Sequence, residues 1–195
     1  MFANADAQRM WIRASNLLFG WSSFPAYYGS DVAVDVTTGQ LLEIPKANDQ
    51  ETREKIDEVA KELDSLATKW GGDVYLYVVP EADIVSDLPI FDLVSNALSY
   101  QEISALFKRE ALAVDVVDGR VTANEYRNGW FGTDHHWKAA GALKAYREIA
   151  EAMRLPDVLS EEQLRSVNYE EPIFYGSLTR RALLEGHPDT IDDIL

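Results

Sequence analysis

The spacing of apolar residues changes several times along the chain, and each spacing predicts a different element. An apolar side on residues 1–19, followed by Gly20, predicts a helix that ends at the glycine. Valines alternate with polar or small residues at 32–36, residues 38–39 can turn, and an apolar run leads to Ile44. This pattern predicts a β-hairpin.

The middle of the chain has the pattern of a helix followed by a buried strand. Apolar residues recur at helical spacing over 56–70, Asn48 with Glu51 can form a capping box, and two glycines at 71–72 can end the helix. Residues 74–79 are β-formers without alternation, which is typical of a central strand covered on both faces. Together these segments predict an α/β fold.

The second half predicts further helices and one more strand. We expect helices over 100–112 and from Lys138 onwards, a short helix starting at Ser160, and a strand at 114–117, whereas residues 122–132 have the composition of a loop. The helix from Lys138 has an apolar face. Its members are Ala142, Tyr146, Ile149, Ala150 and Met153. Ligands of α/β sheets bind at the carboxyl ends of strands, where Pro80, Glu81 and Asp83 would lie; a solvated loop is the default interpretation for these two acids.

Composition narrows the class of protein. The 195 residues suit one domain, and a hydrophobic share of 47% suffices for a core. The net charge of −15 argues against nucleic acid and against an anionic membrane surface as partners. The absence of cysteine excludes disulfides, zinc–thiolate sites and cysteine nucleophiles. We see no run long enough to span a membrane and no signal peptide.

The residues best suited to chemistry form the string Thr133-Asp134-His135-His136-Trp137, which contains two of the three histidines. Asp134 can orient and stabilise the imidazole of His136, which can then act as a general base toward a hydroxyl group. The alternative is that Asp134 caps the helix at Lys138 and the histidines are surface residues.

A metal site is a second interpretation of the same string. Aspartate and histidine ligate metals, and an Asp-His-His string occurs in a class of metal-dependent phosphoesterases. Such a site needs more ligands, and the acids available for it match no motif. These acids are Asp31, Asp35, Asp83 and Asp87. We therefore assign no metal ligand and no cofactor, and keep the phosphoesterase as a lesser alternative.

The segment 131–137, with Gly141, Ala142 and Tyr146 behind it, resembles the signature of the DHHW protein family. That family is similar to the SGNH-hydrolase-like domains of bacterial alginate O-acetylation proteins. Segments 18–44, 56–81 and 174–178 resemble other parts of the pattern, but they are less specific than the Asp-His-His-Trp block.

The resemblance implies a fold and roles for several residues. The fold would be a single three-layer SGNH or flavodoxin-like domain over residues 1–195, with a mostly parallel sheet and an N-terminal helix and hairpin. Asp134 and His136 would be the aspartate and histidine of a Ser-His-Asp triad. Four residues would shape the cleft or bind substrate. These residues are His135, Trp137, Tyr175 and Ser177.

The expected nucleophile is the point at which the sequence departs from the family. The family's serine follows well after the Asp-His block, and no Gly-Asp-Ser or Asp-Ser-Phe string occurs here. We therefore expect the chain to lack the C-terminal part of the pattern, which would leave the sheet incomplete. Ser177 follows a glycine and could replace the nucleophile, although a structural role fits the family pattern better. We expect Ser22 and Ser23 to lie in a connecting loop.

These observations lead to one main function and one rival. The main hypothesis, which the family resemblance implies, is a carbohydrate O-acetyltransferase or esterase domain that is extracytoplasmic or at a bacterial cell surface and acts on a carbohydrate or acetyl ester. The rival is a non-catalytic domain of the same fold that binds a glycan or a protein partner. Aromatic residues such as Trp21, Tyr27, Tyr28, Trp130 and Trp137 could stack on sugar rings, although such residues are more often in the core.

Overall fold

The computed structural model describes residues 23–25, 31–35, 38–156, 166–182 and 189–194. The helices expected over 1–19 and from Ser160 lie outside the described residues. No helix in the part of the chain that the structure describes is both long and apolar enough to cross a membrane.

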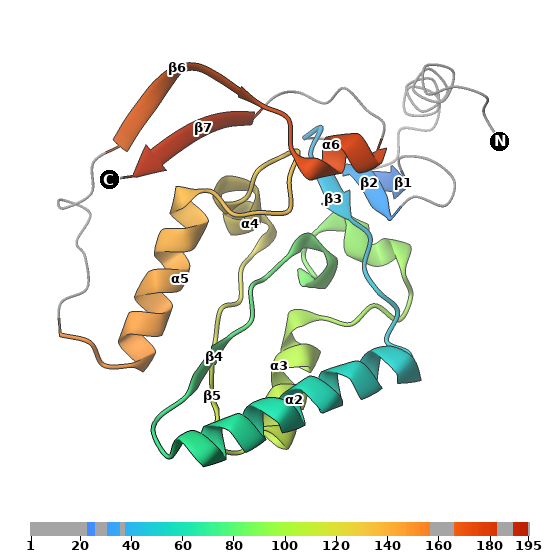
Figure 1. Ribbon diagram of the computed structural model, residues 1–195. Coiled ribbons are helices and arrows are strands. Elements are labelled where there is room, and N and C mark those ends of the chain that lie inside the picture. Colours follow the sequence, from blue (N-terminus) through green and yellow to red (C-terminus); the bar gives the residue numbers. More distant parts are fainter. Residues whose placement is uncertain (1–22, 26–30, 36–37, 157–165, 183–188, 195) are drawn as a thin grey trace.

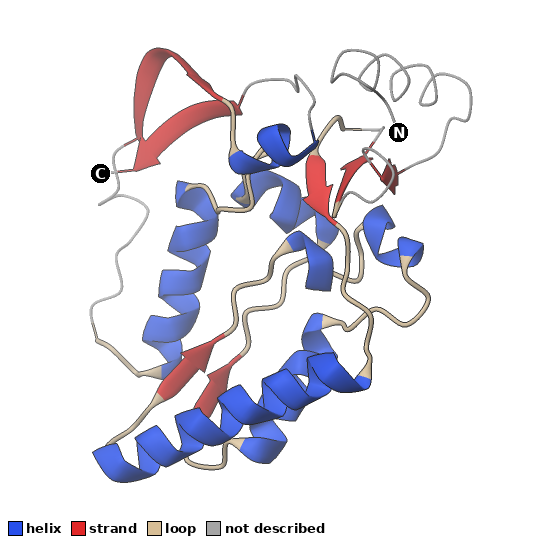
Figure 2. Cartoon of the chain, turned by 45° about the vertical axis from the view of Figure 1, so that its right-hand side comes forward, coloured by secondary structure: helices blue, strands red, loops and turns tan. Residues whose placement is uncertain are grey.

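The centre of the fold is a pair of parallel strands between helices. Strands β4 (Tyr75–Tyr77) and β5 (Asp115–Val117) pair in parallel. Helix α5 (Ala139–Ala152) lies on one side, and α2 (Gln50–Trp70) with α3 (Tyr100–Glu110) lies on the other (Figures 1 and 2). This arrangement of layers confirms the predicted α/β class.

The described strands are shorter than the sequence predicted. β4 covers three residues of the expected six, and all three are half-buried. In the described part of the chain β4 has β5 as its only strand neighbour, so the strand is less enclosed than a central strand of a full sheet.

Helix α2 forms where predicted, but its cap differs by one residue. Asp49, with an extended backbone, accepts a hydrogen bond of 2.8 Å from the amide of Thr52. Asn48 instead accepts a hydrogen bond of 2.6 Å from the side chain of Arg53. At the other end Gly71 adopts the left-handed conformation (φ 71°) that a residue without Cβ favours.

The predicted hairpin is present as part of a small antiparallel sheet. Strands β1 (Ser23–Pro25), β2 (Val32–Asp35) and β3 (Leu41–Glu43) pair in that order. The loop expected at Ser23 was wrong, because Ser23 pairs with Asp35 in the first of these strands. Helix α6 (Ser177–Ala182) packs its Leu178 on this sheet in a separate buried cluster. The helix therefore holds the chain just before it in a fixed place relative to the hairpin.

Two other segments complete the fold. Strands β6 (Ser166–Phe174) and β7 (Asp189–Ile194) form an antiparallel pair above α5 in Figure 1. Two short 3-10 helices, η1 (Ala82–Ile84) and η2 (Pro89–Leu93), follow β4.

The loop prediction for 122–132 was wrong, because residues 123–129 form helix α4 (Ala123–Gly129). Thr122 and Glu125 form a capping box, and Tyr126 stacks on Trp130 with 4.9 Å between ring centroids. The helix is too short for an apolar repeat to be visible in the sequence. The Asn-Gly pair at its end, which is typical of a turn, therefore favoured a loop.

The apolar face predicted for α5 was partly wrong. Tyr146 and Met153 are 36% and 43% exposed, whereas Gly141, Ala145 and Ala150 are buried. A Cβ atom on Gly141 would lie 2.5 Å from the carbonyl oxygen of Gly129. Small residues therefore face the interior because α4 and α5 approach each other closely.

Candidate active site

The Asp-His-His-Trp segment forms a loop between α4 and α5 that closes on itself. The amide of Phe131 donates to the carbonyl oxygen of His136 at 3.1 Å, and the amide of Lys138 donates to that of Gly129 at 2.6 Å. The N-cap of α5 is Lys138, without a side-chain cap. Asp134 therefore does not cap this helix, and the helix-cap interpretation of the motif was wrong.

Asp134 and His136 form a buried acid paired with an exposed imidazole. One carboxylate oxygen of Asp134 accepts from the His136 amide at 3.0 Å and pairs with the Nδ1 atom of its ring. The other oxygen accepts from the Ser177 amide at 2.6 Å. The side chain of Asp134 is 6% exposed and that of His136 is 68% exposed.

The electrostatics of this pair favour an ionised aspartate. Burial by itself raises the pKa of Asp134, but hydrogen bonds from the Ser177 amide and from His136 outweigh burial and lower the pKa to about 2. Because Asp134 occupies Nδ1, the Nε2 atom of His136 is left for a reacting group. An imidazole held in this way can accept a proton from a hydroxyl group.

The Tyr175-Gly176-Ser177 segment crosses directly over the motif. The amide of Gly176 donates to the hydroxyl oxygen of Thr133 at 3.0 Å, and the amide of Leu178 donates to the carbonyl oxygen of Thr133 at 3.1 Å. A Cβ atom on Gly176 would lie 2.3 Å from that carbonyl oxygen. The structure thus brings Ser177 to the predicted site, while Tyr175 is 51% exposed.

Asp189, at the start of β7, is a residue of this site that the sequence did not reveal. Its carboxylate accepts from the amides of Gly132 and Thr133 at 2.7 and 2.8 Å, and from the Thr133 hydroxyl at 2.6 Å. It lies more than 50 positions from the motif in a segment without a recognisable pattern, and no local signal pointed to it.

His135 contacts Ser177, but the geometry differs from a Ser-His-Asp relay. Its Nδ1 atom is 3.0 Å from the Ser177 hydroxyl oxygen and 3.6 Å from a carboxylate oxygen of Asp134. A relay places the serine and the acid on opposite ring nitrogens, whereas here both face the same one. Among the described residues, no hydrogen bond joins His136 to a serine hydroxyl.

The same three residues could also meet a metal ion. Ligand atoms of Asp134, His135 and His136 lie within 4.8 Å of one another. Both oxygens of Asp134 already accept hydrogen bonds, so an ion would have to displace His136 from the carboxylate. The fit of the donor set to a metal is therefore poorer than its fit to an acid–histidine pair.

The other acids proposed for a metal site have different surroundings. Asp31 pairs with Arg181, and Asp35 is 3.3 Å from Arg127. The solvated-loop interpretation was wrong for Asp83, which is half-buried after β4, where burial and the nearby Glu81 raise its pKa to about 6. Among the described residues, none of these acids joins the cluster around Asp134.

Trp137 belongs to the aromatic packing behind the site. Its ring lies 6.3 Å from that of Trp130 and 6.5 Å from that of Tyr77. Trp130 is 1% exposed, so it is a core residue and not a platform for a sugar ring. Trp21, Tyr27 and Tyr28 lie outside the described residues.

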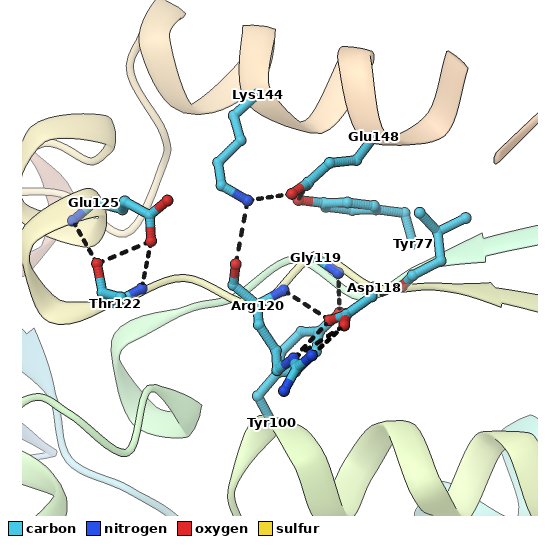
Figure 3. Close-up of polar contacts among 10 residues, drawn as sticks. Tyr77, Tyr100, Asp118, Gly119, Arg120, Thr122, Glu125, Lys144 and Glu148 are labelled. Atoms are coloured by element: carbon cyan, nitrogen blue, oxygen red, sulfur yellow. Dashed lines mark hydrogen bonds and ion pairs between the residues drawn. The ribbon is translucent and has the colours of Figure 1, made fainter. Parts of the chain in front are cut away.

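Tyr77 connects this packing to a polar network at the carboxyl ends of β4 and β5 (Figure 3). Its hydroxyl donates to Glu148 at 2.9 Å, and Lys144 bridges from Glu148 to the carbonyl oxygen of Arg120 at 3.1 Å. A cavity of about 410 Å³ lies beside this network. The network fixes α5, and with it the position of Trp137, against the strand ends.

A family model provides the decisive comparison. It is described as the SGNH hydrolase-like domain of the acetyltransferase AlgX, and it matches residues 37–192. The chain belongs to this family. The resemblance found in the sequence is thereby confirmed, although no curated protein matches the chain by sequence.

Solved structures confirm the SGNH-like fold. The chain is similar to a DHHW family protein from Eubacterium siraeum, with a TM-score of 0.58 and 18% identity over 80% of this chain and 50% of that one. It is similar to PatB1 of Bacillus cereus, solved with a sulfonyl adduct, with a TM-score of 0.60 and 16% identity over 85% and 56%. It also resembles the O-acetyltransferase domain of Pseudomonas putida AlgJ, with a TM-score of 0.54 and 17% identity over 80% and 62%. The chain thus spans 50% to 62% of these three chains.

Proposed function

We propose that this AlgX-family chain is a domain that transfers or hydrolyses acetyl esters of carbohydrate. In this proposal His136 is the general base, and the carboxylate of Asp134 orients and stabilises it. The observation that carries the proposal is the hydrogen-bonded pair of a buried carboxylate and an exposed imidazole. Membership of the family supports an acetylated carbohydrate as substrate and an extracytoplasmic location. Neither the transfer of an acetyl group to a serine nor its removal from that serine needs a cofactor.

The reaction follows from the free ring nitrogen of His136. Its Nε2 atom takes the proton of a serine hydroxyl as the serine oxygen attacks the acetyl carbonyl carbon. The bond between that carbon and the leaving oxygen breaks, and the imidazolium returns the proton to the leaving alcohol. A sugar hydroxyl or water then removes the acetyl group from the serine by the same steps in reverse.

Asp134 acts in this scheme as a permanent negative charge. With a pKa of about 2 it stays ionised at neutral pH, so it stabilises the imidazolium without taking its proton. Among the described residues no serine hydroxyl bonds to His136, so the nucleophile of this scheme has to be identified by experiment.

A covalent probe tests the proposal and identifies the serine. A sulfonyl fluoride is incubated with the chain and with the longest native polypeptide that contains it, and the modified residue is found by mass spectrometry. We expect an adduct on one serine that disappears in His136→Ala, together with hydrolysis of an acetyl ester that is lost in the same variant. Equal labelling and equal hydrolysis in the variant would contradict the proposal.

The second candidate is a non-catalytic domain that binds glycan or a protein partner. It is favoured by the absence of a serine hydroxyl on His136 among the described residues. Saccharide binding without labelling or hydrolysis, in the longest polypeptide, would favour this candidate.

A further inference from the structure

We propose that Asp189 is a positioning residue for the Asp134–His136 pair and acts through Thr133. This inference rests on the proposed function of that pair. The carboxylate of Asp189 accepts three hydrogen bonds from the motif loop, all between 2.6 and 2.8 Å. Hydrogen bonds to an ionised acceptor are stronger than neutral ones, so this contact is well suited to holding a loop in place.

Asp189 sets the direction of the Thr133 hydroxyl group. A hydroxyl has one proton, and Thr133 donates it to Asp189 at 2.6 Å. The lone pairs of the same oxygen can then accept from the Gly176 amide, which lies 3.0 Å away. Without the carboxylate, the hydroxyl would be free to rotate and this bond would lose its fixed acceptor.

The next amide along the chain reaches the catalytic acid. Ser177 donates its backbone N–H to one oxygen of Asp134 at 2.6 Å. That oxygen is thereby occupied, and the other one is left to pair with Nδ1 of His136. A continuous series of contacts therefore runs from Asp189 through Thr133 and the Gly176-Ser177 backbone to the acid.

The consequence concerns the tautomer of His136. When Asp134 is held with one oxygen toward Nδ1, the proton stays on Nδ1 and the Nε2 lone pair is free to act as the base. When the support is lost, Asp134 can turn and both tautomers become populated. Among the described residues, Asp189 bonds to Gly132 and Thr133 and makes no hydrogen bond to the imidazole of His136, so its role is to position the acid.

Nitrogen NMR of the histidine rings gives a direct readout. The full chain is labelled with ¹⁵N-histidine, and the resonances of the three rings are assigned with His135→Gln and His136→Gln. We expect His136 to carry its proton on Nδ1 in the wild type and in Thr133→Ser, which keeps the hydroxyl. We expect mixed tautomers in Asp189→Asn and in Thr133→Val, which has the shape of threonine without the hydroxyl.

Kinetics in the active polypeptide provide the second readout. We expect kcat for an acetyl ester to fall about 10- to 100-fold in Asp189→Asn and Thr133→Val, with KM within about twofold, because a small displacement of catalytic groups has effects of this size. Asp115→Asn makes the same charge change at an exposed position on β5 and should leave kcat and the tautomer unchanged.

The possible outcomes distinguish a positioning role of Asp189 from a role in folding alone, and from the proposed function of the site. If Asp189→Asn does not fold, Thr133→Val still decides, because it retains the carboxylate. A His136 ring that keeps its Nδ1 proton in the folded variants would overturn the positioning role. A wild type without esterase activity, but with the expected tautomer changes, would overturn the proposed function and leave the positioning role standing.

Discussion

Gly176 and Asp134 are so close that a Cβ atom on the glycine would lie 2.3 Å from the Cβ atom of the aspartate. The close approach explains why the backbone after Gly176 can donate to the buried carboxylate. We expect Gly176→Ala to destabilise the fold by about 1–3 kcal/mol, as overpacking does, and to separate Ser177 from Asp134. The free energy of unfolding in urea measures the first effect.

Gly132→Ala serves as a matched control for Gly176→Ala. A Cβ atom there would meet the Asp189 carboxylate at 3.3 Å and the Cγ atom of Gln40 at 3.9 Å, and both of these are side-chain atoms that can shift. A loss of stability in Gly132→Ala as large as that in Gly176→Ala would contradict the steric argument.

The lowered pKa of Asp134 predicts a loss of stability in acid. The carboxyl group of Asp134 has a pKa of 3.8 in the unfolded chain and of about 2 in the folded one. Its contribution to the free energy of unfolding is therefore complete above pH 4 and disappears as the pH falls through 2. The difference amounts to roughly 2 kcal/mol. Urea unfolding of Asp134→Asn and wild type between pH 5 and 2 should show two curves that converge in acid; parallel curves would contradict the prediction.

Asp83 should have the opposite effect. Its pKa is raised to about 6, first by burial and then by Glu81, so the folded state resists its ionisation. The destabilisation is absent below pH 4, grows between pH 4 and 6, and is complete above pH 6. We expect Asp83→Asn to raise the free energy of unfolding at pH 7 by up to about 3 kcal/mol. The change Asp87→Asn, at an exposed position, should have little effect on the free energy of unfolding. An equal gain in this free energy at pH 4 and at pH 7 in Asp83→Asn would show that the ionisation of Asp83 is not the cause.

The contact between α4 and α5 predicts the effect of a methyl group at Gly141. Its Cβ atom would meet the Gly129 carbonyl oxygen at 2.5 Å and the side chain of Trp137 at 3.0 Å. We expect Gly141→Ala to cost about 1–3 kcal/mol, although alanine favours helix. Thermal unfolding would show a lower Tm, and an increase would mean that helix propensity outweighs the packing.

The sequence alone determined the elements whose patterns are local and long. The apolar repeat over 56–70, the alternating valines of the hairpin, and the β-formers near Leu76 each correspond to a described element. The Asp-His-His-Trp string identified the family and both members of the acid–histidine pair, because both lie in one short segment.

Only the tertiary structure decided which distant residues support that segment. Ser177 and Asp189 reach the motif because α6 packs on the hairpin and β7 begins beside the loop. The family resemblance had already placed Ser177 in the cleft, but local sequence could not indicate the contacts themselves, because each joins backbone amides or a hydroxyl to residues more than 40 positions away. The sequence thus named both residues of the Asp134–His136 pair, and packing between segments decided how they are held.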